Sequence, residues 1–332
     1  MKLVMIGVRG HYGLVYQSLP DLPEMEVAGI SAGSNDDISA LRQGLRERGH
    51  APAEFSDYRE MLDKIKPDFV CVSGPFELHA EMCIEALKRN AHVFCEKPVA
   101  ISMKQLEAIK AACAGKPHLR LISMVSMRYA GNYLAAYAAV KAGKIGKVLM
   151  IDARKSYKLG NRPEYYRHFE TYGGTIPWVG IHVIDMIYYF SGSGFKKIFA
   201  TQTRENNFGH GDLEIAAHCQ FAMQNGVMAA CSVDFLRPPA APSHGDTRLR
   251  VAGTLGVLEL IEDGIQDGVR LINTDGNQVL PPLPEKKIFL DLVRGGSDNL
   301  LPRLDALATF DVTAASLLAR ESAETGKVIA LP

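Results

Sequence analysis

Residues 1 to 122 alternate short apolar segments with amphipathic stretches of helical length, and this alternation limits the possible folds more than any other feature. The apolar segments predict strands at residues 2–6, 26–31, 69–73, 92–95 and 119–123. The amphipathic stretches predict helices at residues 12–19, 36–48, 58–64, 79–89 and 103–114. Strands that alternate with helices are typical of a parallel sheet covered by helices. We therefore expect an α/β protein whose first domain, residues 1–122, contains such a sheet.

The pattern changes after about residue 125. Helices are predicted at residues 131–142, 179–191 and about 303–325, and strands at residues 147–157, 196–204, 213–223, 226–235, 247–253, 257–261 and 268–272. Consecutive strands joined by turns such as Gln224-Asn225-Gly226 indicate a mostly antiparallel sheet. A chain of 332 residues is long for a single core. Residues 123–332 are therefore predicted to form a second α/β domain with an open, mostly antiparallel sheet.

Charge and cysteine content exclude several classes of partner. The chain has 37 basic and 37 acidic residues, so no overall charge favours nucleic acid or an anionic membrane. Its six cysteines include no C-x-x-C pair, which is typical of reduced, buried thiols in a cytoplasmic protein. The apolar N-terminus is too short for a secretory signal, and no run approaches the roughly 18 apolar residues of a membrane span. We expect small-molecule partners, self-association and no metal.

A glycine turn, GVRGHYG at residues 7–13, follows the first predicted strand. Free backbone N–H groups and a helix dipole at such a turn favour a dinucleotide pyrophosphate. The glycine spacing is G-x-x-G-x-x-G, so Arg9 occupies the position at which a second glycine normally lets the backbone approach the phosphates. Gly7 and Gly10 are interpreted as phosphate-loop residues, with Arg9, His11 and Tyr12 as further candidates for cofactor binding. A plain strand-to-helix turn is the alternative.

Cofactor choice normally depends on an acid at the end of the second strand, which accepts hydrogen bonds from the adenosine ribose. Here that stretch reads SAGSN and contains no acid, while Asp36 and Asp37 resemble residues that open the next helix. Ser31, Ser34 and Arg9 are candidates to contact a 2′-phosphate. The sequence therefore favours NADP slightly over NAD.

The tetrapeptide Cys95-Glu96-Lys97-Pro98 ends the strand predicted at residues 92–95. In an open α/β sheet, ligands bind outside the carboxyl ends of the strands, so Lys97 is placed to reach a bound substrate. A solvated surface lysine is the alternative interpretation.

Two longer patterns carry a family resemblance. The segment SGPFELH at residues 73–79, followed by a helix, a strand and EKP at residues 96–98, resembles the Gfo/Idh/MocA family of oxidoreductases. So does GGTIPWVGIHVID at residues 173–185. The resemblance implies an N-terminal Rossmann domain that binds NAD or NADP, a C-terminal domain for substrate binding and homodimer or homotetramer formation, and a cis peptide before Pro98. It adds these candidates for cofactor binding: Ser73, Gly74, Pro75, His79, Glu96, Lys97 and Pro98.

His182 and Asp185, in the second pattern, are spaced i, i+3 and so face the same side of a helix. A histidine there suits acid–base work, because its unperturbed pKa is about 6.5. A lone buried histidine is more often only a core residue, but the resemblance implies that His182 is catalytic with Lys97, supported by Asp185. Trp178 departs from the family, since many members carry an Asp four residues before the His. Its ring forms a stacking wall, or Lys97 and His182 alone move the proton, or redox chemistry is lost.

Basic residues interleaved with tyrosines lie between the two patterns. Such a strip is often a solvated face, but in the resembling family this region lines the substrate pocket. The candidates for substrate binding are Arg128, Lys155, Tyr157, His168, Trp178 and His182, with His244 as a weaker one. Their charge suits a carboxylated or phosphorylated sugar.

Together these features predict an NAD(P)-dependent oxidoreductase. The expected reaction is reversible hydride transfer between nicotinamide and a secondary alcohol of a sugar, polyol or sugar acid. Lys97 would orient and help deprotonate the hydroxyl, and His182 would serve as general base or acid. A non-catalytic dinucleotide-binding sensor of the same fold is the alternative, as is a hydrolase that uses bound NAD as an internal redox carrier.

Overall fold

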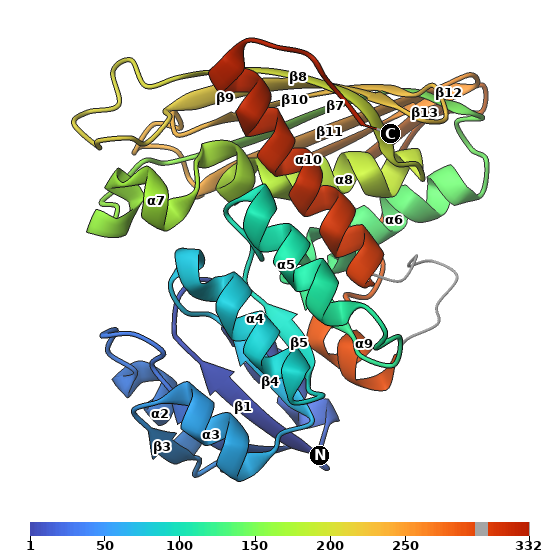
Figure 1. Cartoon of the computed structure of the whole chain (residues 1–332). Helices are drawn as coiled ribbons and strands as arrows, with labels where there is room; N and C mark the ends of the chain where they lie inside the picture. Colours follow the sequence, from blue (N-terminus) through green and yellow to red (C-terminus); the bar gives the residue numbers. More distant parts are fainter. Residues whose placement is uncertain (296–304, 332) are drawn as a thin grey trace. The chain divides into compact units, whose positions relative to one another are not determined.

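The computed structural model describes residues 1–295 and 305–331 (Figure 1). Within these ranges the chain divides into two compact units. The first contains residues 1–124, 287–295 and 305–310, and the second contains residues 125–286 and 311–331. The sequence had assigned everything after residue 122 to the second domain, so two late segments belong elsewhere. Residues 303 and 304, the predicted start of the last helix, lie outside the described residues.

A six-stranded parallel sheet forms the centre of the first unit, with the order β3-β2-β1-β4-β5-β6. Its strands are β1 (Lys2–Ile6), β2 (Glu26–Ser31), β3 (Ala53–Phe55), β4 (Phe69–Val72), β5 (His92–Cys95) and β6 (Leu121–Ser123). Strands β2 and β3 lie on one side of β1, and β4 to β6 on the other. The strand order therefore reverses between β1 and β4, and in sheets of this type ligands bind at the carboxyl ends of the strands that flank the reversal.

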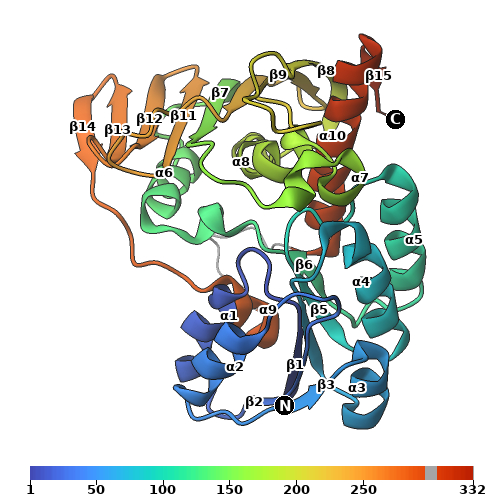
Figure 2. The same ribbon diagram turned by 90° about the vertical axis from the view of Figure 1, so that its left-hand side faces the viewer.

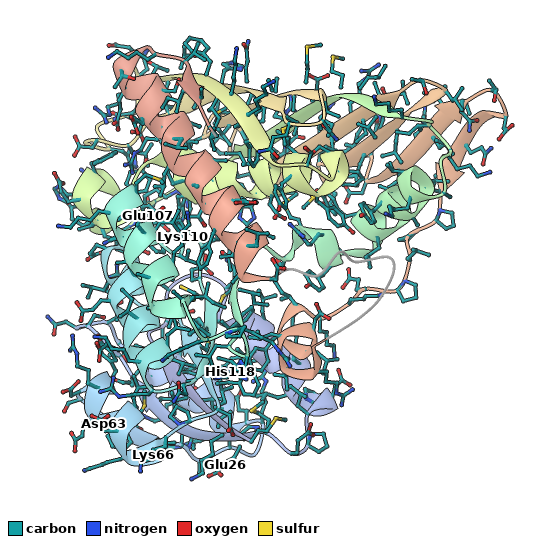
Figure 3. All side chains as sticks on the ribbon, turned by 45° about the vertical axis from the view of Figure 1, so that its right-hand side comes forward. Glu26, Asp63, Lys66, Glu107, Lys110 and His118 are labelled. Carbon is teal, nitrogen blue, oxygen red and sulfur yellow. The ribbon has the colours of Figure 1, made fainter. Side chains whose placement is uncertain are left out.

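Helices cover both faces of this sheet. They are α1 (Gly13–Ser18), α2 (Ser39–Arg46), α3 (Tyr58–Ile65), α4 (His79–Lys88), α5 (Met103–Cys113) and α9 (Ile288–Arg294). Figure 2 shows α1, α2 and α9 on one face and α3, α4 and α5 on the other. Their outer sides are charged; Lys110 and Glu107 on α5, labelled in Figure 3, form an ion pair of 2.9 Å. Such pairs contribute little to stability but keep the helix surface polar.

Helix α9 packs against the first sheet although it is more than 150 residues away from it in the sequence. The ring of Phe289, which is fully buried, packs against Phe94 with ring centroids 5.3 Å apart and against Phe69 at 6.3 Å. The guanidinium of Arg120, next to β6, donates hydrogen bonds to the carbonyl oxygens of Leu292 and Val293 at the end of α9. Burial of this apolar face explains why residues 287–295 belong to the first unit and not, as predicted, to the second domain.

The second unit contains a nine-stranded sheet with the order β14-β13-β12-β11-β7-β10-β9-β8-β15. Its strands are β7 (Val148–Tyr157), β8 (Phe195–Thr203), β9 (Ala216–Met223), β10 (Met228–Asp234), β11 (Gly245–Gly253), β12 (Gly256–Glu262), β13 (Gly268–Asn273), β14 (Gly276–Leu280) and β15 (Ile329–Ala330). Every neighbouring pair is antiparallel except β7 and β10. The predicted mostly antiparallel sheet is confirmed.

Among the described residues, helices lie against only one face of this sheet. They are α6 (Gly131–Lys141), α8 (Ile181–Ser191) and the part of α10 (Ala306–Thr325) that belongs to this unit (Figure 1). Two hydrogen bonds fix α10: the Ala200 N–H donates to Ser322 Oγ at 3.0 Å, and Tyr188 donates to Asp311 at 3.1 Å. No helix within residues 1–295 or 305–331 combines the length and apolar character that crossing a bilayer requires.

Candidate active site

The glycine turn after β1 allows close approach of two backbone segments. Gly7 has a φ of +85°, and a Cβ there would lie 2.3 Å from the carbonyl oxygen of Ser73, which follows β4. A Cβ on Gly10, with a φ of +72°, would lie 2.3 Å from the carboxyl carbon of Glu96. The Arg9 N–H donates to the Ser73 carbonyl at 2.7 Å. Gly7 and Gly10 thus lack a Cβ where the backbone segments approach closely, and a glycine turn of this kind suits a pyrophosphate bound by backbone groups.

Glu96 and Lys97 follow β5 directly and are almost completely buried. The Glu96 carboxylate accepts the His11 backbone N–H at 2.8 Å, faces His11 Nδ1 at 3.0 Å, and lies 4.0 Å from Lys97 Nζ. Burial favours the protonated acid, but His11 and then Lys97 outweigh it and hold the pKa of Glu96 below its usual value. One carboxylate therefore joins the glycine turn to the candidate catalytic lysine.

His79 holds the backbone behind this site. Its ring is fully buried, with Nδ1 2.9 Å from the Pro98 carbonyl and Nε2 3.0 Å from the Gly74 carbonyl. Burial lowers the pKa of His79, and a neutral imidazole donates to only one of two acceptors. The Lys97–Pro98 peptide is cis, as the resemblance implied. His79 was predicted to bind cofactor, but the structure places it where it positions Gly74 and Pro98.

Arg9 pairs with Asp36, for which the sequence predicted a different role. Its guanidinium donates to both carboxylate oxygens of Asp36, at 2.7 and 3.1 Å, and this hydrogen bonding lowers the pKa of Asp36. Asp37, two residues before α2, accepts the N–H of Ser39, the first residue of that helix, at 2.9 Å. Asp36 was expected to help open that helix, but its carboxylate pairs with the arginine of the glycine turn. Ser34 accepts the Asp36 N–H at 3.1 Å and so shapes the same loop.

In the second unit, α8 carries His182 and Asp185, both buried. Asp185 accepts a bidentate ion pair from Arg128, with a distance of 3.0 Å between Asp185 Oδ2 and Arg128 Nε. Burial opposes the charge on Arg128, but the Asp185 carboxylate outweighs it and raises the pKa of the guanidinium. The guanidinium also lies 4.8 Å from the Tyr189 ring centroid. Arg128 and Asp185, predicted to bind substrate and to support catalysis, thus pair with each other and fix α8.

Glu214 supports the double-glycine turn before α8, and the sequence did not reveal this role. It is fully buried and accepts hydrogen bonds from the Tyr172 hydroxyl at 2.6 Å and from the Thr175 N–H at 3.0 Å. Thr175 Oγ1 donates in return to the Glu214 carbonyl at 2.7 Å. These bonds hold the double-glycine turn from which the π-helical turn Ile176–Gly180 and then α8 begin. A single acid about forty residues downstream has no spacing signal that would connect it to this turn.

Trp178 and Lys155 lie in the same unit among aromatic rings. Trp178 stacks on Phe235, with centroids 6.1 Å apart, and meets Tyr166 edge-on at 4.7 Å. Lys155 Nζ donates to Thr247 Oγ1 at 2.6 Å. Burial lowers the pKa of Lys155 to about 8, against the opposing effects of Glu262 and Asp246.

Two further candidates from the basic strip lie in different surroundings. Tyr157 stacks on His244, with ring centroids 4.9 Å apart, and its own ring lies 5.2 Å from Lys155 Nζ. His168 instead has an exposed side chain, which pairs with Glu164 at 3.3 Å. The structure therefore brings Lys155, Tyr157 and His244 together and leaves His168 outside their contacts.

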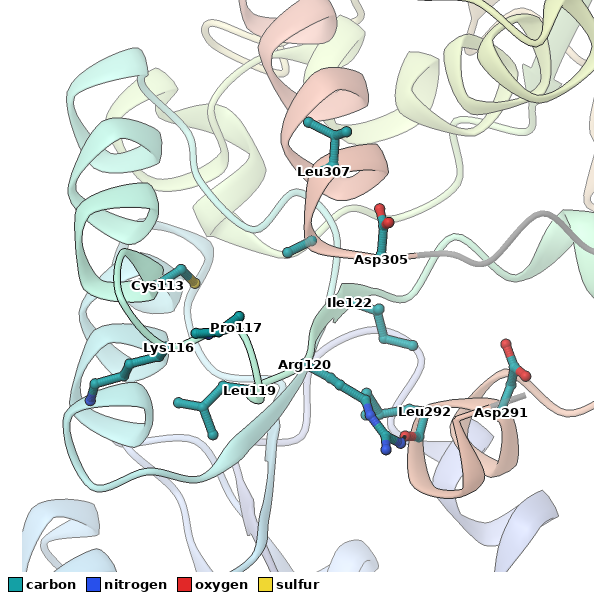
Figure 4. A pocket seen from close by; sticks show the side chains of 11 residues that line it. Cys113, Lys116, Pro117, Leu119, Arg120, Ile122, Asp291, Leu292, Asp305 and Leu307 are labelled. Atoms are coloured by element: carbon teal, nitrogen blue, oxygen red, sulfur yellow. Dashed lines mark hydrogen bonds between the residues drawn. The ribbon is translucent and has the colours of Figure 1, made fainter. Parts of the chain in front are cut away.

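A cavity of about 280 Å³ lies elsewhere in the first unit, between β6, the end of α5 and α9 (Figure 4). Arg120, Asp291 and Asp305 line it, and Arg120 reaches the end of α9. None of the predicted site residues borders this cavity. Within residues 1–295 and 305–331, no group of three or more His, Cys, Asp or Glu side chains is placed to hold a metal.

A doubly wound sheet with a glycine turn at its switch point and a buried lysine after β5 is typical of dinucleotide-dependent oxidoreductases. Residues 1–123 match the oxidoreductase family with an NAD-binding Rossmann fold, and residues 133–259 match the GFO/IDH/MocA C-terminal domain. The chain therefore belongs to the Gfo/Idh/MocA family, which confirms the resemblance seen in its sequence.

Several relatives are similar over much of the chain. A Thermotoga maritima structure described only as an oxidoreductase is 35% identical, covers 100% of both chains and gives a TM-score of 0.93. The uncharacterized oxidoreductase YrbE of Bacillus subtilis is 29% identical over 77% of this chain and 73% of its own. Inositol 2-dehydrogenase of Salmonella typhimurium is 27% identical, but the match spans only 52% of this chain and 50% of that enzyme. Levoglucosan dehydrogenase in complex with NADH and L-sorbose shares the fold, with 19% identity, coverage of 100% and 99%, and a TM-score of 0.80.

Proposed function

We propose that the protein is a dehydrogenase that transfers hydride between nicotinamide and a secondary alcohol of a sugar, polyol or sugar acid. The observation that carries the proposal is the buried Lys97, joined through Glu96 to the glycine turn. A lysine held in this way at a strand end has a fixed position relative to a cofactor on that turn. Relatives named as dehydrogenases of inositol and of levoglucosan support the substrate class.

The residues have separate roles in this proposal. Gly7 and Gly10, with the Ser73-Gly74-Pro75 turn, would hold the dinucleotide, whose nicotinamide supplies the hydride acceptor or donor when bound. Lys97 orients the hydroxyl and helps to remove its proton. His182 serves as general base or acid, a role in which imidazole commonly contributes about 10²- to 10⁴-fold in rate. Asp185 acts through Arg128 by holding α8, and Trp178 forms a wall against which a sugar ring can pack.

The pairing of Arg9 with Asp36 favours NAD over NADP, which reverses the slight preference drawn from the sequence. A carboxylate in the loop after β2 can accept hydrogen bonds from the ribose hydroxyls, and it repels a 2′-phosphate. Arg9, the proposed partner of that phosphate, already has a carboxylate partner. Dissociation constants for the two cofactors test this choice, and tighter binding of NADP would contradict it.

The main test is turnover with a panel of cyclitols, aldoses and sugar acids, followed by absorbance of the reduced nicotinamide. Lys97→Met keeps the buried volume but removes the amine, so we expect kcat to fall by about 10²- to 10⁴-fold. Lys104→Met, an exposed lysine at the start of α5, is the matched control. Turnover that is equally fast in the Lys97 variant would remove the lysine from the mechanism.

A second candidate function is a sensor that binds the dinucleotide without turning it over. The observation in its favour is Trp178, which occupies the position where many relatives carry an acid and which cannot itself move a proton. The two functions separate in the same assay. Tight cofactor binding with no turnover on any panel member supports the sensor, and turnover that depends on Lys97 supports the dehydrogenase.

We also propose that the protein forms a homodimer or homotetramer through the helix-free face of the second sheet. Met150, Met228 and Phe199 lie along a shallow groove there, and Met228 is 63% exposed. Burial of an apolar sheet face by a second copy is favourable, because it removes apolar surface from water. Sedimentation of the wild type and of Met228→Glu tests the interface; we expect the substitution to shift the protein toward monomer.

A further inference from the structure

A cluster of one arginine and three aromatic rings lies beside the residues proposed for the substrate. The guanidinium carbon of Arg162 is 4.8 Å from the ring centroid of Phe235, 5.4 Å from Trp178 and 5.8 Å from Tyr166. The rings come from the π-helical turn before α8, from the chain just after β10 and from a short helical turn. Stacking of this kind holds an arginine in one place and leaves the edge of its guanidinium free to form hydrogen bonds.

Arg162, which is partly buried, differs from Arg128 and Arg320 because no carboxylate among the described residues pairs with it. Arg128 has Asp185, and Arg320 has Glu324 at 3.6 Å. Arg162 donates only to the Lys158 carbonyl, at 2.9 Å, and its Nε is buried without a hydrogen-bond partner in the part of the chain that the structure describes. A desolvated cation without a counter-charge is costly, so this position favours an anion brought from outside the chain.

Neighbouring side chains add positive charge to the same region. Burial lowers the pKa of Arg162, and only tyrosines, not carboxylates, oppose that effect. Burial lowers the pKa of His244 most, and the positive charges of Arg162, Lys158 and Lys155 lower it further. Lys155 does face acids, Glu262 and Asp246, so its charge is partly balanced, whereas that of Arg162 is not.

The surroundings of Arg162 indicate which anion fits. The planar guanidinium offers N–H donors in a fork that matches a carboxylate. The adjacent rings of Trp178 and Tyr166, 9% and 6% exposed, surround the guanidinium with apolar surface that suits the C–H side of a sugar. Trp178 also precedes His182 by four residues, so the cluster is continuous in the chain with the residue proposed for proton transfer.

We propose that Arg162 binds the carboxylate of a sugar acid, while Trp178 and Tyr166 pack against its carbon skeleton and Lys155 and Lys158 add positive charge to the region. The inference rests on the proposed function and narrows its substrate class to aldonic or uronic acids. Arg162 is then a specificity-determining residue that selects anionic over neutral substrates.

Binding can be measured without turnover, because Trp178 is the single tryptophan of the chain. The full-length protein without added cofactor is titrated with D-gluconate, D-glucuronate, D-glucose and myo-inositol at constant ionic strength, and tryptophan emission is recorded. We expect saturable changes with the two acids at concentrations at least about tenfold lower than with the neutral compounds. Arg162→Met should weaken binding of the acids by about 10- to 100-fold and that of the neutral compounds by less than about twofold.

Controls separate recognition from packing. Arg167→Met removes an exposed arginine of the same segment, one that pairs with Glu164 and not with the rings, and should leave acid binding unchanged. Arg162→Gln replaces Arg162→Met if the latter fails to melt cooperatively. Equal weakening for acids and neutral compounds would assign Arg162 to packing and overturn the inference. Tighter binding of D-glucose 6-phosphate than of either acid would overturn the carboxylate assignment.

The outcomes also distinguish this inference from the proposed function. Turnover of neutral polyols with no response to sugar acids would leave the dehydrogenase and remove the anion site. Sugar-acid binding that depends on Arg162, with no turnover on any compound with either cofactor, would support the anion site and remove the dehydrogenase.

Discussion

The charged side chains around the glycine turn of the first unit and those around Trp178 in the second unit are arranged in opposite ways. Around the turn, Glu96 faces His11 and Lys97, and Asp36 faces Arg9. Around Trp178, Arg162 has aromatic neighbours and no carboxylate among the described residues. A site whose charges are matched internally suits a cofactor held mainly by backbone groups. A site with an unmatched cation suits a ligand that brings its own charge.

The largest expected effect on stability comes from breaking a buried ion pair. Asp185→Asn leaves the buried Arg128 without its carboxylate, and we expect a loss of about 3–5 kcal/mol in the free energy of unfolding, measured by urea denaturation. Arg162→Met removes a cation that has no carboxylate partner and should cost far less.

The double variant Asp185→Asn with Arg128→Met should recover part of the loss, because the uncompensated charge is then gone. Equal losses of unfolding free energy in Asp185→Asn and Arg162→Met would contradict the proposed difference between a paired and an unpaired arginine.

Glu96 provides a test based on pH. Its pKa is lower in the folded protein than in the unfolded chain, so the unfolded chain binds more protons in the acid range. The stabilisation from Glu96 is therefore complete above the unfolded pKa of about 4.3 and is lost as the pH falls through the folded value.

We expect Glu96→Gln to be less stable than the wild type by about 1–3 kcal/mol near pH 6, with a difference that shrinks on acidification. Urea denaturation of both proteins between about pH 3 and 6 measures it. A difference that grows toward acid would contradict the charge pairing around the glycine turn.

Asp36→Asn should change cofactor preference. Loss of a charged acceptor weakens NAD binding by about tenfold, and the freed Arg9 becomes available to a 2′-phosphate. Asp37→Asn, which removes only the neighbouring acid that opens α2, is the control. Dissociation constants for NAD and NADP from quenching or calorimetry give the ratio, and an unchanged ratio in Asp36→Asn would exclude Asp36 from cofactor choice.

The smallest effect concerns Lys155, which is cationic below its pKa of about 8 and neutral above it. Affinity for a sugar acid should therefore be full below pH 8 and fall by about two- to fivefold as the pH rises through 8, as expected for a partly screened charge. Tryptophan emission titrations at pH 7 and 9 measure it. Lys155→Met should remove this pH dependence, and a wild-type affinity that rises with pH would contradict it.

The sequence predicted the elements that pattern or apolar character marks clearly. Strands β1, β2, β4 and β5 are mostly apolar and were predicted within one residue of their ends. Strand β3 was missed because two of its three residues are exposed, and β14 because four of its five are. Helix α9 was also missed, since seven residues give little periodicity and its contacts lie far away in the chain.

Site residues divide in the same way. Gly7, Gly10 and Lys97 were predicted because each follows a strand at the switch-point edge of the sheet. The sequence did not predict the pairing of Arg128 with Asp185, the position of Glu214 or the cluster of aromatic rings around Arg162. Each of these contacts joins single residues that are far apart in the chain. Contacts of this kind form no recognisable motif in the sequence, because the residues meet only in the folded protein.

Helix α9 has a consequence for the order in which the protein is made. The first sheet is synthesised early, but Phe69 and Phe94 pack against the ring of Phe289, which is added about two hundred residues after them. Until then, the nascent N-terminal domain exposes an aromatic patch that its final partner will cover. A chain that ended before this helix would lack part of the core of the first unit. That unit is therefore completed only after most of the second has been synthesised.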